Sequence, residues 1–235
     1  MKTIELGGLT CRLLGGDDRE GGGTGPLVVL LHGFGAPGDD LVGLYRGIDA
    51  PRGTRFLFPQ APMTLPPQYM GGRAWWPIDI ARLEQAMMRG ETRDLSREVP
   101  AGLPEARAKV TALLHEAIDA LHPSSIVLGG FSQGAMLSCD VAFHDDTKLA
   151  GLVVFSGTIV AENEWAPRVA SRRGLRVLQS HGREDPLLPF GIAERLSETL
   201  KAAGLDVRWI PFNGGHGIPP AALDGLGALL RDVLV

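Results

Sequence analysis

The sequence is poor in cysteine, in aromatic residues and in long apolar runs. It holds only two cysteines, Cys11 and Cys139, in 235 residues, and aromatic side chains make up 6%. Two cysteines do not form the disulfide framework of a small secreted protein, so we expect both to be reduced core residues. No apolar run approaches the ~20 residues that a membrane-spanning helix needs. The sequence therefore predicts no membrane span.

Runs of basic residues are also missing. Lys plus Arg total 23 against 27 for Asp plus Glu, which gives a formal net charge of -4. Because nucleic-acid binders need a concentrated cationic face, this pattern argues against nucleic acid as a partner. Residues 1–5 lack the apolar stretch of a signal peptide, so a cytoplasmic location is expected.

The sequence does contain a regular alternation of short apolar runs with stretches of helical periodicity. The apolar runs are continuous, which is typical of strands covered on both faces, as in a parallel sheet. Strands are predicted at residues 27–31, 55–58, 125–128, 152–155, 176–179 and 207–210. Helical stripes cover residues 103–121, 192–203 and 223–233. This alternation predicts an open, doubly wound α/β sheet with right-handed crossovers.

Two segments stand apart from the alternation. Residues 2–14 fit a hairpin that turns at Gly7 and Gly8 and forms an antiparallel edge of the sheet. Residues 59–101 carry several prolines, tryptophans and methionines without a clean strand, and long insertions of this kind often form a lid or binding loop. Since the sequence shows no repeats and no second core, residues 1–235 are interpreted as one domain with this insertion.

The strongest catalytic signal is the run 130–134, Gly-Phe-Ser-Gln-Gly, which fits G-x-S-x-G. An apolar strand over 125–128 leads into it, and the helix-forming stretch 135–142 follows. Small residues on both sides of the serine allow a sharp strand-to-helix turn that exposes its Oγ. The positive end of the helix then faces a developing oxyanion. Ser132 is therefore the predicted nucleophile, and an incidental serine in a Gly-rich turn is the alternative.

A catalytic serine needs a base and a carboxylate that orients the base. His216 lies in a glycine-rich loop between the last predicted strand and the last helix, from which an imidazole can reach the serine. His32 and His181 each end a strand, where they can bond the backbone. In this type of site the acid lies between serine and histidine in the chain. Asp185 follows directly on a strand and is the predicted acid, with Glu184 as a solvated neighbour.

An oxyanion hole is predicted from two backbone N–H groups. One belongs to Gln133, which follows the nucleophile, and the other to Phe34 in the run 32–35, His-Gly-Phe-Gly, after an early strand. Glycines on both sides of Phe34 allow the turn that this position requires, and an ordinary Gly-rich turn is the alternative. The sequence has no Cys/His cluster with the spacing of metal ligands. Neither a metal nor another cofactor is expected.

Together these motifs resemble the phospholipase/carboxylesterase family of the α/β-hydrolase fold, which includes acyl-protein thioesterases and small bacterial carboxylesterases. The matching segments are residues 31–35, 58–62, 73–76, 130–135, 155–157, 181–182, 185–186, 188–189 and 215–218. The resemblance implies a mostly parallel central sheet flanked by helices. It also implies a triad of Ser132, Asp185 and His216, and oxyanion donors at Phe34 and Gln133.

The predicted reaction is hydrolysis of carboxylic esters or thioesters through an acyl-enzyme. By resemblance to the family, Trp75 and Leu188 line the acyl site. The expected substrates are small molecules or acylated proteins that carry small to medium acyl chains. The apolar loop region would serve the interface of a homodimer as readily as a substrate.

Other functions remain open at this point. Dienelactone hydrolases share the fold but normally use cysteine as nucleophile, whereas position 132 is serine. Lipases, peptidases and depolymerases are further serine hydrolases, and the short chain without a large cap domain favours small or extended acyl substrates. A non-catalytic binding module on the same fold is the third alternative, although such modules usually lose a triad member.

Overall fold

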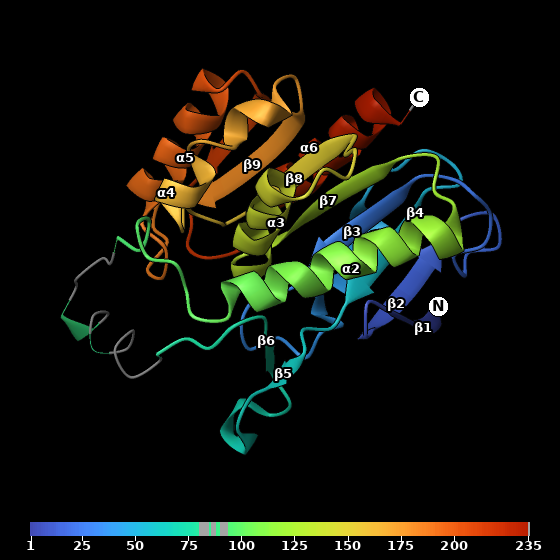
Figure 1. Cartoon of the computed structure of the whole chain (residues 1–235), viewed down its shortest axis with the longest axis horizontal. Coiled ribbons are helices and arrows are strands. Elements are labelled where there is room, and N and C mark those ends of the chain that lie inside the picture. Colours follow the sequence, from blue (N-terminus) through green and yellow to red (C-terminus); the bar gives the residue numbers. More distant parts are fainter. Residues whose placement is uncertain (80–84, 86–87, 90–93, 235) are drawn as a thin grey trace.

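A computed structural model describes residues 1–79, 85, 88–89 and 94–234 of the chain. Its centre is an eight-stranded sheet with helices on both faces (Figure 1). The strands of this sheet are, in spatial order, β1 (Lys2–Leu6), β2 (Leu9–Gly15), β4 (Arg55–Pro59), β3 (Leu27–Leu31), β7 (Ile126–Phe131), β8 (Gly151–Phe155), β9 (Arg176–Gly182) and β10 (Asp206–Phe212). The helices are α2 (Leu103–Leu121), α3 (Gln133–His144), α4 (Glu162–Trp165), α5 (Phe190–Ala202) and α6 (Pro220–Val233), with the 3-10 turns η1 (Asp40–Gly47), η2 (Pro67–Tyr69) and η3 (Val169–Arg172).

The sheet is parallel from β4 to β10 and antiparallel at its N-terminal edge. Each predicted strand is present, which confirms the expectation of an α/β sheet. The hairpin over residues 2–14 is confirmed as well, because β1 pairs with β2 and the turn residues Gly7 and Gly8 have φ values of 59° and 68°. All the parallel strands therefore place their carboxyl ends at one edge, where α/β folds bind ligands.

Apolar side chains pack on both faces of the sheet, in two separate clusters. The helices α2, α3 and α5 cover one face, while η1 and α6 cover the other (Figure 1). Helix α2 buries Val110, Leu113, Leu114 and Ala117, the spacing of a single helical stripe. Helix α3 is buried on all sides from its first turn, because it lies between α2 and the strands β7 and β8.

Both cysteines are free and buried, which confirms that they are core residues. Burial raises the pKa of the Cys11 thiol to about 12, and burial likewise raises the pKa of Cys139. Since the thiolate is the reactive form, neither sulfur is prepared for nucleophilic chemistry.

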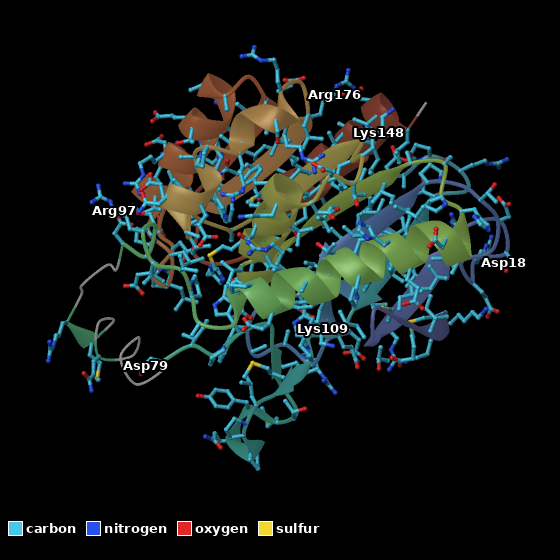
Figure 2. The ribbon with its side chains drawn as sticks, viewed as in Figure 1. Asp18, Asp79, Arg97, Lys109, Lys148 and Arg176 are labelled. Carbon is cyan, nitrogen blue, oxygen red and sulfur yellow. The ribbon has the colours of Figure 1, made fainter. Side chains whose placement is uncertain are left out.

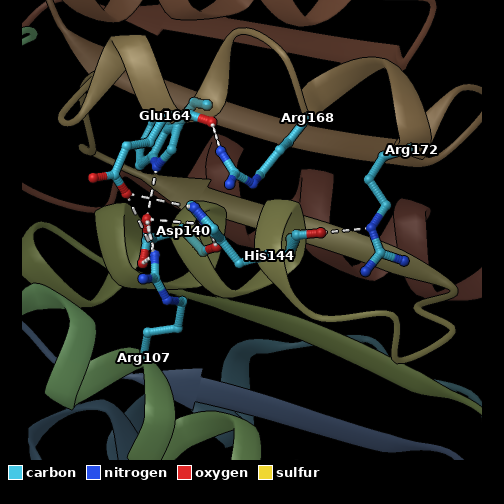
Figure 3. Close-up of polar contacts among 8 residues, drawn as sticks. Arg107, Asp140, His144, Glu164, Arg168 and Arg172 are labelled. Atoms are coloured by element: carbon cyan, nitrogen blue, oxygen red, sulfur yellow. Dashed lines mark hydrogen bonds and ion pairs between the residues drawn. The ribbon is translucent and has the colours of Figure 1, made fainter.

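Asp140 is a buried carboxylate on α3 that connects this helix to α2 and α4 (Figure 3). Its Oδ2 lies 3.0 Å from Arg107 Nη1, and its Oδ1 accepts a 2.8 Å hydrogen bond from Trp165 Nε1. One turn along α3, His144 approaches Asp140 Oδ1 at 3.4 Å and Glu164 Oε2 at 3.5 Å. The network fixes the helix that follows the predicted nucleophile.

The same cluster contains the residue types that bind metals. Asp140, His144 and Glu164 each offer a ligand atom within 4.8 Å of the others. However, Arg107 already lies 3.0 Å from Asp140 and 3.8 Å from Glu164, so a guanidinium supplies the positive charge that a metal ion would bring. We interpret the cluster as a structural ion-pair network.

Removing the Asp140 carboxylate should therefore destabilise the fold. Asp140→Ala leaves Arg107 with only its 3.8 Å ion pair to Glu164 and leaves the indole N–H of Trp165 without an acceptor. Breaking a buried pair from one side costs about 3 kcal/mol. Urea unfolding at pH 7 measures the loss. Asp206→Ala is the matched control, since its ion pair with Arg176 spans 3.9 Å between exposed side chains and contributes about 1 kcal/mol or less. Equal stability of the two variants would contradict this role.

The insertion at residues 59–101 contains a small antiparallel hairpin that the sequence does not predict. Strands β5 (Met63–Thr64) and β6 (Arg73–Ala74) pair and project from the body of the molecule (Figure 1). Two residues per strand are too few to leave a recognisable pattern in the sequence. The insertion also includes residues 80–84, 86–87 and 90–93, which lie outside the described residues. Within the described ranges, none of the helices combines the length and apolar character that a membrane crossing requires.

Candidate active site

Ser132 lies at a sharp turn between β7 and α3. Its φ of 54° and ψ of -118° fall in a region that residues other than glycine seldom adopt. The glycines of the motif are needed because the turn packs tightly against β3. A Cβ on Gly130 would come within 2.5 Å of the Leu31 carbonyl oxygen, and one on Gly134 within 2.2 Å. Any side chain at either position would collide with β3, which explains why the turn requires the two glycines of G-x-S-x-G.

His216 and Asp185 are in direct contact, although 31 residues separate them in the chain. The Nδ1 atom of His216 lies 2.7 Å from Asp185 Oδ2. The other carboxylate oxygen, Oδ1, accepts hydrogen bonds of 2.9 Å from the N–H groups of Leu187 and Leu188. Because the carboxylate only accepts, Nδ1 carries the hydrogen and Nε2 of His216 is left as the acceptor.

The Asp185 carboxylate remains ionised in spite of its burial. Burial alone would raise its pKa, but hydrogen bonds from His181, His216 and the Leu188 N–H hold the pKa well below its usual range. An ionised carboxylate beside the imidazole stabilises the imidazolium that forms when histidine acts as a base.

A second histidine, which was not predicted to contact the acid, also lies against Asp185. The fully buried His181 places Nε2 2.9 Å from the Leu188 carbonyl oxygen and 3.2 Å from Asp185 Oδ2. Both neighbours are acceptors, so Nε2 carries the hydrogen. The expected backbone bond at this strand end is present. The spacing of four residues between His181 and Asp185 was the signal in the sequence for an additional role of His181 as a positioning residue.

The loop that carries His216 is fixed near the serine turn. The rings of His216 and Phe131, the residue before Ser132, have centroids 4.8 Å apart. The Ser156 hydroxyl donates a 2.8 Å hydrogen bond to the Gly217 carbonyl oxygen, which anchors the loop to the end of β8. Among the residues that the structure describes, no hydrogen bond joins Ser132 to His216. Such bonds are often formed only when substrate is present.

The segment after β3 lies against the serine turn. A Cβ on Gly33 would be 3.3 Å from Ser132 Cβ, so the backbone next to Phe34 is close to the predicted nucleophile. Gly35 N–H donates to the Arg73 carbonyl oxygen at 2.9 Å, which ties this segment to β6. In the described part of the chain, the N–H groups of Phe34 and Gln133 donate no hydrogen bond to a backbone carbonyl of a loop or helix cap. Both remain available for a ligand.

The Gln133 side chain bridges the serine turn and the tryptophan pair. Its Oε1 accepts from the Trp75 N–H and its Nε2 donates to the Trp76 carbonyl oxygen, both at 2.9 Å. Trp75 Nε1 in turn donates to the His32 carbonyl oxygen at 2.9 Å. Trp75 is only 2% exposed and Leu188 8% exposed. Trp75 therefore connects the two segments that carry the predicted oxyanion donors.

His32 is buried in one defined, neutral form. Burial lowers its pKa more than the Gly33 hydrogen bond and the charge of Asp40 raise it. Its Nε2 accepts a 2.9 Å bond from the Ala61 N–H, so Nδ1 carries the hydrogen and donates to the Gly33 carbonyl oxygen at 2.8 Å. Protonation at Nε2 would break the bond to Ala61.

This arrangement predicts a loss of stability in mild acid. The unfolded chain binds a proton at His32 before the folded chain does, so stability is complete above the unfolded-state pKa of about 6.5. Below that pH, the free energy of unfolding should fall by up to ~1.4 kcal/mol per pH unit until the folded-state pKa is reached. Urea unfolding between pH 8 and pH 5 measures the slope. His32→Gln, which does not titrate, should show a shallower slope, and an unchanged slope would exclude His32 as its source.

The parallel sheet, the serine turn after β7 and the histidine and aspartate after later strands define a protein of the α/β-hydrolase fold. The model of the Phospholipase/Carboxylesterase family matches residues 21–232, and the chain belongs to this family.

Individual relatives agree with this assignment. The chain is 31% identical over 216 residues to acyl-protein thioesterase 1 of Gibberella zeae, covering 88% of this chain and 90% of that protein. Its structure is similar to the crystal structure of esterase PE8, with 30% identity, a TM-score of 0.80 and coverage of 98% and 100%. The carboxylesterase of Bacillus cereus has a TM-score of 0.69 at 19% identity, a likeness of fold alone.

Proposed function

We propose that this protein is a serine hydrolase that cleaves carboxylic esters or thioesters of small to medium acyl chains. Ser132 is the nucleophile, His216 the general base and Asp185 the residue that orients it. The N–H groups of Phe34 and Gln133 bind the oxyanion. The proposal rests above all on the 2.7 Å contact between His216 Nδ1 and Asp185 Oδ2, beside the Ser132 turn.

The reaction proceeds in two acyl transfers. His216 Nε2 takes the hydroxyl proton as Ser132 Oγ attacks the carbonyl carbon, and the oxyanion forms between the two N–H groups. Collapse expels the alcohol or thiol, which receives the proton from His216. Water, deprotonated by the same nitrogen, then attacks the acyl-enzyme, and the second collapse releases the carboxylic acid as His216 returns the proton to Ser132 Oγ. Asp185 stabilises the imidazolium in both steps.

The relatives support an ester or thioester as the bond that is cleaved. One is named an acyl-protein thioesterase and another an esterase. We assign the acyl site to the region of Trp75, Leu188 and the insertion 59–101, within a single domain of residues 1–235. The homodimer, the cytoplasmic location and the absence of a cofactor stay predictions of the sequence.

The direct test is hydrolysis of p-nitrophenyl esters from acetyl to palmitoyl, with acyl-coenzyme A thioesters of the same lengths in parallel. Turnover of either series with an optimum at one chain length would support the proposal and size the acyl site. Labelling of the folded protein by a fluorophosphonate separates an enzyme from a binding module. Failure to turn over any substrate, together with failure to label, would refute the proposal in favour of the binding module.

A further inference from the structure

A hollow of about 410 Å³ lies at the edge of the sheet opposite to the triad. Three segments line it, which are the loop after β2, the end of η1 with the turn that follows, and the start of β4. Strand β4 is parallel to β3, so its start lies at the amino edge, whereas the predicted triad follows the carboxyl ends. The hollow is therefore separate from the acyl-transfer site.

Three arginines that line this hollow have no hydrogen-bond or ion-pair partner for their side chains within the described part of the chain. They are Arg19, Arg46 and Arg52. By contrast, Arg55 nearby donates to the carbonyl oxygens of Gly25 and Leu121. Like charges that share one hollow repel each other, and an anion bound between them removes this repulsion.

The loop that presents Arg19 is held by its own hydrogen bonds. Arg19 has a φ of 65°, and its carbonyl oxygen accepts from the Gly15 N–H at 3.2 Å. Asp18 Oδ1 accepts from the N–H groups of Glu20 and Gly22 at 2.7 and 2.8 Å. Figure 2 shows Asp18 in this loop at one end of the molecule. The backbone at Arg19 is thus preorganised.

The other two arginines border an apolar wall and a buried hydroxyl. Arg46 is in the last turn of η1, and Arg52 lies in the turn that Thr54 N–H closes. The Thr54 hydroxyl is buried without a hydrogen-bond partner. The rings of Tyr45 and Phe56 pack edge to face with centroids 5.2 Å apart. Cations, the half-buried ring of Tyr45 packed on the buried Phe56, and a volume within the range of small-molecule sites meet at this place.

We infer that this hollow binds a small phosphorylated molecule, with Arg19, Arg46 and Arg52 on its phosphate oxygens and the remainder against Tyr45. The guanidinium group is suited to this role because its planar fork donates two parallel hydrogen bonds to phosphate. Asp17 is a carboxylate at the rim, with Oδ1 3.5 Å from the position of a Cβ on Gly53. The residues that line the hollow include three arginines and no Asp or Glu, so the hollow favours an anion.

Calorimetric titration with inorganic pyrophosphate at about 0.15 M salt, where exposed charges are screened, is the test. The wild type should bind it saturably and melt at a higher temperature when it is present. Each single change, Arg19→Gln, Arg46→Gln or Arg52→Gln, should weaken binding about tenfold, and the triple change should abolish it. Asp17→Asn should tighten binding.

Arg173→Gln is the matched control. Arg173 also lacks a side-chain partner in the described residues, and it lines a second basic hollow of about 280 Å³ with Lys148, labelled in Figure 2. This variant should bind pyrophosphate as the wild type does, and p-nitrophenyl ester hydrolysis should be unchanged in all the variants.

Absence of saturable binding to the wild type would overturn the inference, as would equal losses in Arg173→Gln and the single variants. Vesicles that contain a phosphoinositide distinguish the two sources of phosphate. Binding to vesicles without binding of free pyrophosphate would assign the arginines to a membrane surface and overturn the small-molecule site. Because the readout is binding, failure of this inference leaves the hydrolase proposal untouched.

Discussion

Replacing Ser132 with alanine is expected to lower kcat for ester hydrolysis about a million-fold while the fold remains intact. Alanine lacks the Oγ that forms the acyl-enzyme, and no neighbouring group can take its place. The change removes one oxygen from a half-buried side chain and leaves the close approach of Gly130 and Gly134 to Leu31 as it is. The oxyanion donors and substrate binding should leave a residual rate above that of water.

The measurement is release of p-nitrophenol from the ester with the optimal chain length, together with the mass of the protein after treatment with a fluorophosphonate. The wild type should gain the mass of one phosphonyl adduct, and Ser132→Ala should gain none. Ser171→Ala serves as the control, because its hydroxyl only donates to the Arg168 carbonyl oxygen on the surface. Wild-type turnover or labelling in Ser132→Ala would exclude this serine as the nucleophile.

Most strands of the sheet were predictable because they are short, largely apolar runs that end at or within two residues of glycine, proline or histidine. The runs at 27–31 and 152–155 match β3 and β8 within one residue. The spatial order of the strands was harder to predict from the sequence. The sequence indicates parallel strands, but only tertiary packing places β4 between β2 and β3.

The relation between Asp185 and His216 could be predicted from chain order and from their positions after strands. The side-chain bridges around them could not. Gln133 was expected to contribute its backbone N–H. Nothing in its sequence neighbourhood indicates that its side-chain amide also bonds the backbone of Trp75 and Trp76, which lie 58 and 57 residues earlier in the chain. Contacts of this kind depend on how loops from distant parts of the chain meet above the sheet.

The cluster of arginines in the hollow could not be predicted from the sequence either. The sequence has no run of basic residues, and this argued against a concentrated cationic face. The fold nevertheless collects Arg19 from the loop after β2, and Arg46 and Arg52 from η1 and the turn that follows it, into one place. A charge pattern read along the chain detects contiguous patches, whereas a small-molecule site needs only a few side chains that converge.

Asp185→Asn is expected to lower kcat about ten-thousand-fold, because the side chain that replaces Asp185 would face His216 with the wrong group. The N–H groups of Leu187 and Leu188 both donate to Oδ1, so they select the carbonyl oxygen of asparagine for that position. The NH₂ group is then forced toward His216 Nδ1. A donor at this place moves the imidazole hydrogen to Nε2, which can no longer accept the proton of Ser132.

The same NH₂ group would also oppose the Nε2–H of His181, which lies 3.2 Å from Asp185 Oδ2. Two donors that face each other in a buried site should lower the free energy of unfolding as well as the rate. The aspartate itself stabilises the fold above its unfolded-state pKa of about 3.9, and this contribution is lost as the pH falls toward its depressed folded-state pKa. The advantage of wild type over Asp185→Asn in urea unfolding should therefore be greater at pH 7 than at pH 3.

Steady-state kinetics at pH 7 separate this effect from a defect in binding, since kcat should fall while KM changes little. Glu184→Gln is the control, because Glu184 is the adjacent exposed carboxylate and, in the described structure, its side chain forms no hydrogen bond or ion pair with His216. A large loss in Glu184→Gln with normal turnover in Asp185→Asn would transfer the role of the acid to Glu184. Equal, small losses in both would mean that His216 needs no carboxylate for its orientation, and that the 2.7 Å contact does not carry the catalysis.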